Sequence, residues 1–354
     1  MGLHYTQLPE NVLDIIRRGA VIPAHPLALD EKRNFDRKRQ RALTRYYVDA
    51  GVGGLAVGVH TTQFAIRDNG LYEPVLKAAI EDSRAWTDRP LAMIAGVAGQ
   101  TAQALNEAKN AKELGYHAVL ISMGALKGQT SAELIQHCKT IAEEIPVIGF
   151  YMQTSVGGII LDEDFWCEFA RIDNAIAIKV APFHRYRTLD VLRGIVKAKA
   201  ENKITLYTGN DDHIVADLTL PFTFARGDEA VTLRFKGGLL GHWSVWTKRA
   251  VELLDRIHQE IADNKPVSQS LLALDAKVTD CNAAFFDVAN NFHGCIAGCH
   301  EVLRRQGLLE GIWCLDENEG LSQGQAEEIS RVYQAHPDLH DDEFVAQNRE
   351  RWLA

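Results

Sequence analysis

The sequence predicts an α/β fold, a (β/α)8 TIM barrel followed by a C-terminal helical extension. Short apolar runs alternate with longer helix-like stretches from about residue 20 to residue 242, which is typical of a parallel sheet with crossover helices. Five successive runs end 27 to 29 residues apart, near the roughly 31 residues that each unit of an eight-unit barrel occupies. Ala24-His25-Pro26-Leu27 follows the first run, where an open doubly wound sheet would carry a glycine-rich phosphate turn.

Eight apolar runs are expected to form the barrel strands. They are Ala20–Ala24, Leu55–His60, Leu91–Ala95, Ala118–Ser122, Pro146–Tyr151, Ala175–Lys179, Ile204–Thr208 and Gly237–Gly241. Between them, stretches such as Thr101–Leu114 and Ser131–Glu143 carry the periodicity of amphipathic helices.

Three parts are expected along the chain: an N-terminal helix over residues 1–18, the barrel over 19–243, and a C-terminal helical region over 244–354. Within the last part, residues 244–262, 269–306 and 322–335 have helical patterns. Ser322 and Gln325 predict a capping box before the last of these helices.

Composition excludes several classes of protein. The net charge is −9 and no basic stripe recurs, so nucleic acids and anionic membrane surfaces are poor partners. No apolar run approaches the ~20 residues of a membrane span, and the first residues lack the pattern of a secretory signal. Six cysteines in 354 residues are too sparse for a disulfide scaffold, so we expect reduced thiols and a cytoplasmic location.

Side-chain size differs between the two faces of several expected strands, because successive residues point to opposite faces. In Ala175–Lys179 the isoleucines form one face, whereas the alanines and Lys179 form the other. The strands that end at His60 and Tyr151 also carry small residues before a terminal polar group. If the bulky faces meet the helices, His60, Tyr151 and Lys179 point into the barrel mouth, where barrel active sites lie.

Lys179 is the leading catalytic candidate. Burial at the end of an apolar strand would disfavour the ammonium and leave a nucleophilic amine, which can form an imine with a ketone. Tyr151 would end a neighbouring strand about 4.8 Å away and could relay protons. The alternatives are a lysine that reaches solvent and a tyrosine that caps the core.

Polar turns near these strands suggest binding roles. Hydroxyls and backbone N–H groups of Thr61 and Thr62, after His60, could hold a carboxylate, although these are also ordinary turn residues. His184, Arg185 and Arg187 follow Lys179 and could bind an anionic second substrate, or they could form a solvated loop. For each of these two segments, the sequence does not decide between a binding role and an ordinary loop.

Two clusters could suggest a metal, but neither has a convincing pattern. Asn210-Asp211-Asp212 is more typical of a helix cap than of a cation site. Four further residues crowd one expected helix, His293, Cys295, Cys299 and His300. They lack the paired spacing of a zinc site, so we expect buried thiols and packed histidines and no metal.

Gly19–Pro23, Ala50–Leu55 and Ile94–Gly99 resemble the first three units of the dihydrodipicolinate synthase / N-acetylneuraminate lyase family of class I, Schiff-base-forming aldolases. The likeness covers about residues 19–250. It implies that Lys179 is the Schiff-base lysine and Tyr151 the proton-relaying tyrosine. It also matches the loop that begins at Gly209, so Gly209, with Thr61 and Thr62, is expected at the substrate.

The chain departs from this family at several positions. Val59-His60-Thr61-Thr62-Gln63 stands in place of the family's Gly-Thr-Thr-Gly-Glu turn, and Met152-Gln153-Thr154 in place of Asn-x-Pro. Val156 stands where the synthase branch has an arginine for a second carboxylate. The family's second tyrosine is missing from Ser122-Met123-Gly124. A role in lysine biosynthesis is therefore not expected, and the chain is a divergent member.

The resemblance implies a lyase that acts on a 2-oxo acid such as pyruvate, with an aldehyde partner, or on a 2-oxo-3-deoxy sugar acid. The covalent imine on Lys179 would serve in place of any cofactor, with His60 and Tyr151 assisting. The alternatives are an imine-dependent dehydratase or decarboxylase and a non-catalytic barrel that binds a 2-oxo acid. A homotetramer or homodimer is the assembly that the resemblance suggests.

Overall fold

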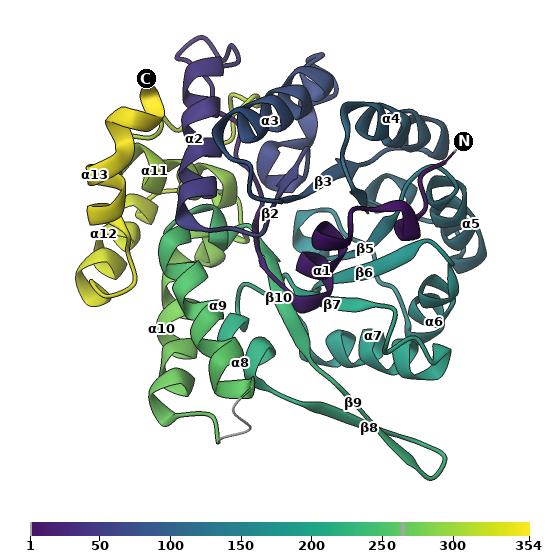
Figure 1. Cartoon of the computed structure of the whole chain (residues 1–354). Helices are drawn as coiled ribbons and strands as arrows, with labels where there is room; N and C mark the ends of the chain where they lie inside the picture. The colour runs from purple at the N-terminus through teal and green to yellow at the C-terminus, as the bar shows by residue number, and fades with distance from the viewer. Residues whose placement is uncertain (1, 263–265) are drawn as a thin grey trace.

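The computed structural model describes residues 2–262 and 266–354. Within these residues, eight parallel strands form one sheet, and a bridge between Ala24 and Ala56 joins its first and second strands. The barrel strands are β1 (Val21–Pro23), β2 (Gly54–Val57), β3 (Ala92–Val97), β4 (Ala118–Ile121), β5 (Val147–Met152), β6 (Ala175–Ala181), β7 (Thr205–Thr208) and β10 (Phe235–Leu240). The sheet therefore closes on itself, and the prediction of a (β/α)8 barrel is confirmed (Figure 1).

A helix follows each barrel strand and covers its outer face (Figure 1). In chain order the helices are α2 (Arg37–Ala50), α3 (Tyr72–Trp86), α4 (Thr101–Leu114), α5 (Ser131–Ala142), α6 (Glu163–Arg171), α7 (Arg185–Ala198), α8 (Ile214–Thr219) and α9 (Thr247–Ala262). Local sequence sets their ends: Thr130 and Glu133 form a reciprocal capping box at the start of α5, and α2 stops at Gly51, whose φ is +100°.

The barrel strands separate two apolar cores. The inner core contains residues such as Ile94, Ile148 and Leu239, together with Ile15 and Ile16 of α1 (Glu10–Arg18). Helix α1 therefore packs into the amino-terminal end of the barrel. The outer core lies between the strands and the surrounding helices. Because that end is filled with apolar side chains, polar chemistry is left to the carboxyl ends of the strands.

An antiparallel hairpin, which the sequence analysis did not predict, is inserted before the last barrel strand. It consists of β8 (Phe222–Arg226) and β9 (Glu229–Leu233) and extends away from the barrel (Figure 1). Gly227, with φ +62°, forms its turn. The alternation of phenylalanine with small residues before this glycine was an available signal for a hairpin.

The prediction of one continuous helix over residues 269–306 is wrong, because the helix is interrupted in the middle of this range. Helix α10 (Gln269–Phe285) ends at Phe285, and helix α11 (Cys295–Arg305) begins at Cys295 after a short connecting segment. Asp287, Asn291 and Phe292 have φ between +53° and +65°, a left-handed conformation that no helix interior contains. This break carries the C-terminal region over the mouth of the barrel.

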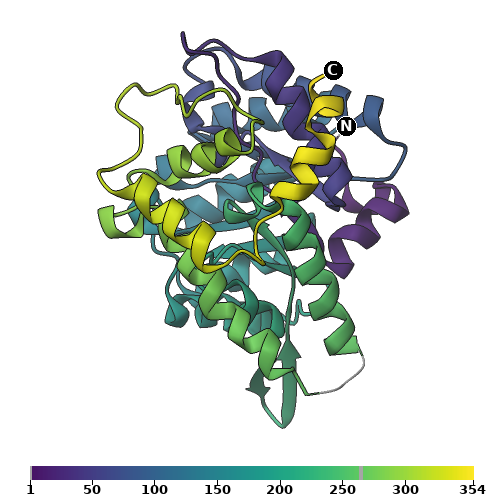
Figure 2. The same cartoon turned by 90° about the vertical axis from the view of Figure 1, so that its left-hand side faces the viewer.

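Two further helices, α12 (Gln325–Ala335) and α13 (Asp342–Leu353), complete the chain. Figure 2 shows them in yellow across one side of the molecule, where α13 packs against α2. The capping box expected before α12 is only half formed. Gln325 accepts a hydrogen bond from the Ser322 N–H, whereas the Ser322 hydroxyl donates to Asp287 instead of capping the helix.

Candidate active site

Lys179 lies on β6 with its side chain inside the barrel, as predicted. It is 7% exposed, and its Nζ lies 4.4 Å from the centre of the Phe150 ring. Gly209 makes this position available, because a Cβ at Gly209 would lie 2.6 Å from Lys179 Cε. Gly209 therefore shapes the site through its missing side chain, in addition to its position on the cavity wall.

Asp211 is the charged neighbour of this amine. Burial lowers the pKa of Lys179, and the negative charge of Asp211 offsets part of that shift. Burial also raises the pKa of Asp211, although an N–H from His242 donates to its Oδ1 at 3.0 Å. Lys179 and Asp211 form no direct ion pair within the described chain. Each of the two charges therefore shifts the pKa of the other group without a direct contact between them.

The prediction that Tyr151 points into the barrel mouth is wrong. Tyr151 belongs to the outer core. Its ring lies 5.4 Å from that of Trp166 on α6, and its hydroxyl accepts a hydrogen bond from the Leu161 N–H at 3.2 Å. In the register of β5 with β6, Phe150 is the partner of Lys179. The inward position beside the amine therefore carries a phenyl ring and no phenol.

The physical reason is the location of Gly149. A Cβ at this residue would lie 2.9 Å from the rings of both Trp166 and Phe169. The glycine makes room for the aromatic side chains of α6 outside the barrel, so small residues mark the outer face of β5. On β6 the opposite holds, because Ala177 lies in the inner core and Ile178 in the outer core.

The turn after β2 places His60 and Thr61 on the wall of the cavity that contains Lys179. Burial, and then the charge of Lys179, lower the pKa of His60 to about 4, so its imidazole is neutral. The Thr61 hydroxyl has no hydrogen-bond partner among the described residues. Thr62 lies behind the turn: its hydroxyl donates to the His25 carbonyl and accepts from the Gly58 N–H. Its side chain therefore builds the turn and does not line the cavity.

The cavity around Lys179 spans about 460 Å³ when the space open to solvent is included. Part of its wall comes from the carboxyl ends of β5, β6 and β7. Phe286 and Cys295 of the C-terminal region also line it. Burial raises the pKa of the Cys295 thiol well above its usual value, so it is a neutral wall rather than a nucleophile. The C-terminal region thus covers part of the cavity that contains the Lys179 amine.

The other residues singled out in the sequence have mostly structural roles. Asn210 accepts from the Phe183 N–H and donates to Asp217, and Arg185 is ion-paired with Asp217. All six cysteines are free and buried, and His300 contacts the Ile312 carbonyl. In the described part of the chain, no group of three or more histidine, cysteine or acidic residues is arranged to hold a metal ion.

A model of the Dihydrodipicolinate synthetase family matches residues 18–233 of the chain. The chain belongs to this family. The resemblance expected from the sequence is thereby confirmed. Among relatives, a 4-hydroxy-tetrahydrodipicolinate synthase from Persephonella marina is 30% identical over 41% of this chain and 50% of its own length. An N-acetylneuraminate lyase 2 from Escherichia coli is 25% identical over 56% of this chain and 63% of its own length.

Solved structures of the Dihydrodipicolinate synthetase family share the fold of this member. A dihydrodipicolinate synthase from Acinetobacter baumannii, complexed with pyruvate, has a TM-score of 0.73 at 21% identity and covers 89% of this chain and 98% of its own. An N-acetylneuraminate lyase from Fusobacterium nucleatum has a TM-score of 0.70 at 17% identity, over 92% and 99%. The sequence matches are shorter: this family member spans about half the length of the first curated relatives.

Sequence reasoning missed three residues of this family member's cavity. Phe150 was overlooked because Tyr151 follows it, and Phe286 because the helix break was not predicted. Asp211 was considered only as a cap or a metal ligand. Its position two residues after Gly209, at the carboxyl end of a barrel strand, was the available signal for a place in the active site.

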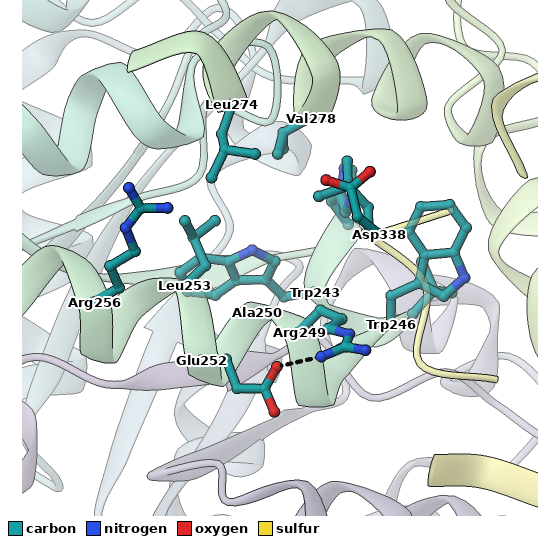
Figure 3. A pocket seen from close by; sticks show the side chains of 13 residues that line it. Trp243, Trp246, Arg249, Ala250, Glu252, Leu253, Arg256, Leu274, Val278 and Asp338 are labelled. Atoms are coloured by element: carbon teal, nitrogen blue, oxygen red, sulfur yellow. Dashed lines mark hydrogen bonds and ion pairs between the residues drawn. The ribbon is translucent and has the colours of Figure 1, made fainter. Parts of the chain in front are cut away.

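A separate cavity, which spans about 870 Å³ with the space open to solvent included, lies between α9 and α10, on the outside of the barrel (Figure 3). Trp243 and Trp246 form part of its wall, and Arg249 and Glu252 form an ion pair at 2.8 Å beside it. Lys179 and Asp211 do not line it. This cavity is therefore separate from the one that Lys179 and Asp211 line. In addition, no helix in the described residues has the length and apolar character needed to cross a bilayer.

Proposed function

We propose that this protein is a Schiff-base-forming lyase for a 2-oxo acid, with Lys179 as the nucleophile. The observation that carries the proposal is a buried amine of lowered pKa at the carboxyl end of a closed barrel, on the wall of a cavity at the barrel mouth. A buried amine without a direct ion pair has little structural purpose, because burying its charge costs free energy. Membership of the Dihydrodipicolinate synthetase family supports the same chemistry.

The first steps require only this amine and one carbonyl group. The uncharged Nζ of Lys179 adds to the C2 ketone, and loss of water from the carbinolamine forms the imine. We assign the substrate carboxylate to the turn that carries Thr61, because Thr61 lines the cavity and its hydroxyl has no hydrogen-bond partner in the described chain. No other cofactor is needed, because the protonated imine accepts the electron pair of the breaking bond.

In the lyase direction, the C3–C4 bond then breaks. Its electron pair enters the imine to form an enamine, the C4 hydroxyl loses its proton, and an aldehyde leaves. Protonation of the enamine at C3 and hydrolysis of the resulting imine release the shortened 2-oxo acid and restore Lys179. Each step moves a proton, so a proton carrier must lie on the cavity wall.

We propose Asp211 as the principal proton carrier, with His60 as a neutral hydrogen-bonding partner. Asp211 is buried on the same wall, and burial raises its pKa toward the physiological range, which suits a general acid and base. Tyr151 cannot act as this proton carrier, because its side chain lies on the outer face of the barrel. The Asp211 oxygen that His242 does not contact has no protein partner in the described chain, so it is open to substrate.

A dehydratase that uses the same imine is the second candidate. A relative from Acinetobacter baumannii, 26% identical over 38% of this chain, is named "Probable 5-dehydro-4-deoxyglucarate dehydratase". Asp211 could serve either outcome, by taking a hydroxyl proton in cleavage or by protonating a leaving hydroxyl in dehydration.

The absence of a cavity phenol among the described residues also suits a barrel that binds a 2-oxo acid without turnover.

Trapping of the imine tests the proposal. Borohydride reduction in the presence of pyruvate should leave a covalent adduct on Lys179, located by peptide mass mapping, and Lys179→Met should abolish it. Lys203, a half-buried lysine whose ammonium donates to the Ile172 carbonyl, should stay unmodified in the same digest. An unmodified Lys179 with pyruvate and a panel of longer 2-oxo acids would refute the proposal. Product analysis with 2-oxo-3-deoxy acids would then distinguish cleavage, dehydration and simple binding.

The proposal extends to assembly and location. A homotetramer or homodimer is proposed on the family resemblance, although one solved relative is described as a monomeric variant, and sedimentation equilibrium would measure the state. Six buried free thiols suit a reducing compartment such as the cytoplasm.

A further inference from the structure

A second cavity adjoins the one that contains Lys179, and we call it the outer cavity. It spans about 910 Å³ when the space open to solvent is included, and Gln153 and Phe183 line both cavities. Its remaining walls come from the start of α7, from Asp212, and from α10 and the segment after it. A molecule held at Lys179 that is too long for the inner cavity would therefore extend into the outer one. The helix break over residues 286–294 builds part of this wall.

Arg187 is the unpaired cation of the outer cavity. Its neighbours on α7 are engaged, because Arg185 is paired with Asp217 and Arg193 with Glu163. Arg187 is half-buried and has neither an ion pair nor a hydrogen bond in the described chain. A planar guanidinium on a cavity wall is well suited to bind a carboxylate or a phosphate through two hydrogen bonds.

The start of α7 adds to the positive potential at this wall. His184, at the N-cap position, gives the helix no side-chain cap and also lines the outer cavity. The first N–H groups of an uncapped helix are hydrogen-bond donors that favour an anion. Helix α7 has 14 residues, long enough to have a substantial dipole.

Asp212 provides a polar contact of the opposite kind. Asp212 lines the outer cavity, and its carboxylate accepts no hydrogen bond in the described chain, although its Oδ1 is buried away from the cavity. A ligand hydroxyl could donate to the other carboxylate oxygen, which has no hydrogen-bond partner in the described chain and is not buried in this way. Asn282, Thr154 and Ser155 also line the outer cavity and offer further polar contacts.

We propose that the outer cavity binds the far end of the substrate, a hydroxylated chain that ends in an anionic group. The anionic group, a carboxylate or a phosphate, contacts Arg187 and the start of α7, and a hydroxyl donates to Asp212. This inference rests on the proposed imine at Lys179, which holds the other end. It narrows the substrate class to 2-oxo acids with a second anionic group.

Calorimetric titration with three six-carbon 2-oxo-3-deoxy acids tests this inference. They differ only at C6, which is a hydroxymethyl group, a carboxylate or a phosphate ester. We expect the wild type to bind at least one anionic form about tenfold or more tightly than the hydroxymethyl form, the usual range for a charge-assisted pair. The preferred anionic form identifies the terminal group.

The variants are Arg187→Met, Arg187→Lys and, as a matched control on the same helix, Arg193→Met. Arg187→Met should reduce the preference to near onefold, Arg187→Lys should keep part of it, and Arg193→Met should keep all of it. Thermal unfolding checks that each variant is folded. A wild type without preference, or an Arg187→Met protein that retains it, would overturn the inference.

Failure of the proposed function has a different result. Borohydride trapping with pyruvate on the wild type and on Arg193→Met reports the imine without any distal group. Should no adduct form while the anionic preference depends on Arg187, the outer cavity is a binding site and the lyase proposal fails. Should the adduct form without that preference, the lyase proposal stands and the outer-cavity proposal fails.

Discussion

Replacement of Gly209 by alanine should remove the amine from its working position while the fold survives. The new Cβ would lie 2.6 Å from Lys179 Cε and 2.7 Å from Ala181 Cβ. Carbon atoms pack best about 3.5–4.0 Å apart, so each contact overlaps by about 1 Å. The backbone of Gly209 does not have a positive φ, so the conflict is purely steric.

The two contacts yield in different ways. Ala181 is part of β6 and cannot move alone, so we expect a stability loss of about 1–3 kcal/mol, as for other overpacked sites. The Lys179 side chain is flexible and should swing away. A misplacement of about 1 Å can cost about 100-fold in rate, so imine formation should fall much further than stability.

The assay follows the rate of borohydride trapping with pyruvate, beside urea unfolding of the same protein. Gly320→Ala is the control, because its Cβ would have no neighbour within 4 Å, and both readouts should match the wild type. Ala181→Gly, added to Gly209→Ala, should recover part of the stability without recovering the trapping rate. A Gly209→Ala protein that traps pyruvate at the wild-type rate would refute this reading of the site.

Three further predictions concern the proton carrier, the displaced tyrosine and the C-terminal region. Asp211→Asn removes the charge that raises the pKa of Lys179. That pKa should fall further, so the acidic limb of the trapping-rate profile should move to lower pH while turnover falls about 100-fold or more; a limb that moves upward contradicts the coupling. Tyr151→Phe loses one hydrogen bond outside the barrel and should cost about 1 kcal/mol in urea unfolding, with trapping unchanged; a large loss of trapping would return Tyr151 to the mechanism. Trp352→Ala empties a fully buried site on α13 and should cost about 3–5 kcal/mol in the same assay, and a loss under 1 kcal/mol would show that α13 is loosely attached.

Much of the fold could be predicted from local hydrophobic patterns in the sequence. Each apolar run and each amphipathic stretch reports on its own neighbourhood, and near-constant spacing between runs is possible only in a repeated unit. The structure confirms the closed barrel with Lys179 buried inside it. Its place on the face of Ala177 follows from the alternation of the strand, which needs no knowledge of distant segments.

The orientation of Tyr151 required information that the strand itself does not contain. The rule that small residues face inward holds for β6 but fails for β5, because Gly149 accommodates Trp166 and Phe169 of the following helix. Which face of a strand needs space depends on the side chains that pack against it. Because neighbouring residues of a strand point to opposite faces, the wrong choice of inward face predicted the phenol of Tyr151 beside Lys179, where the structure has the phenyl ring of Phe150.

By itself, the sequence determined the barrel, its family and the position of Lys179 inside the barrel, because these depend on periodicity and on residues within a single strand. Only the tertiary structure decided what surrounds that lysine. Asp211 reaches it from the neighbouring strand's loop, and Phe286 and Cys295 arrive from a segment more than 100 residues further along the chain. Such contacts arise when distant segments share one apolar core, and their partners are not encoded in any local pattern.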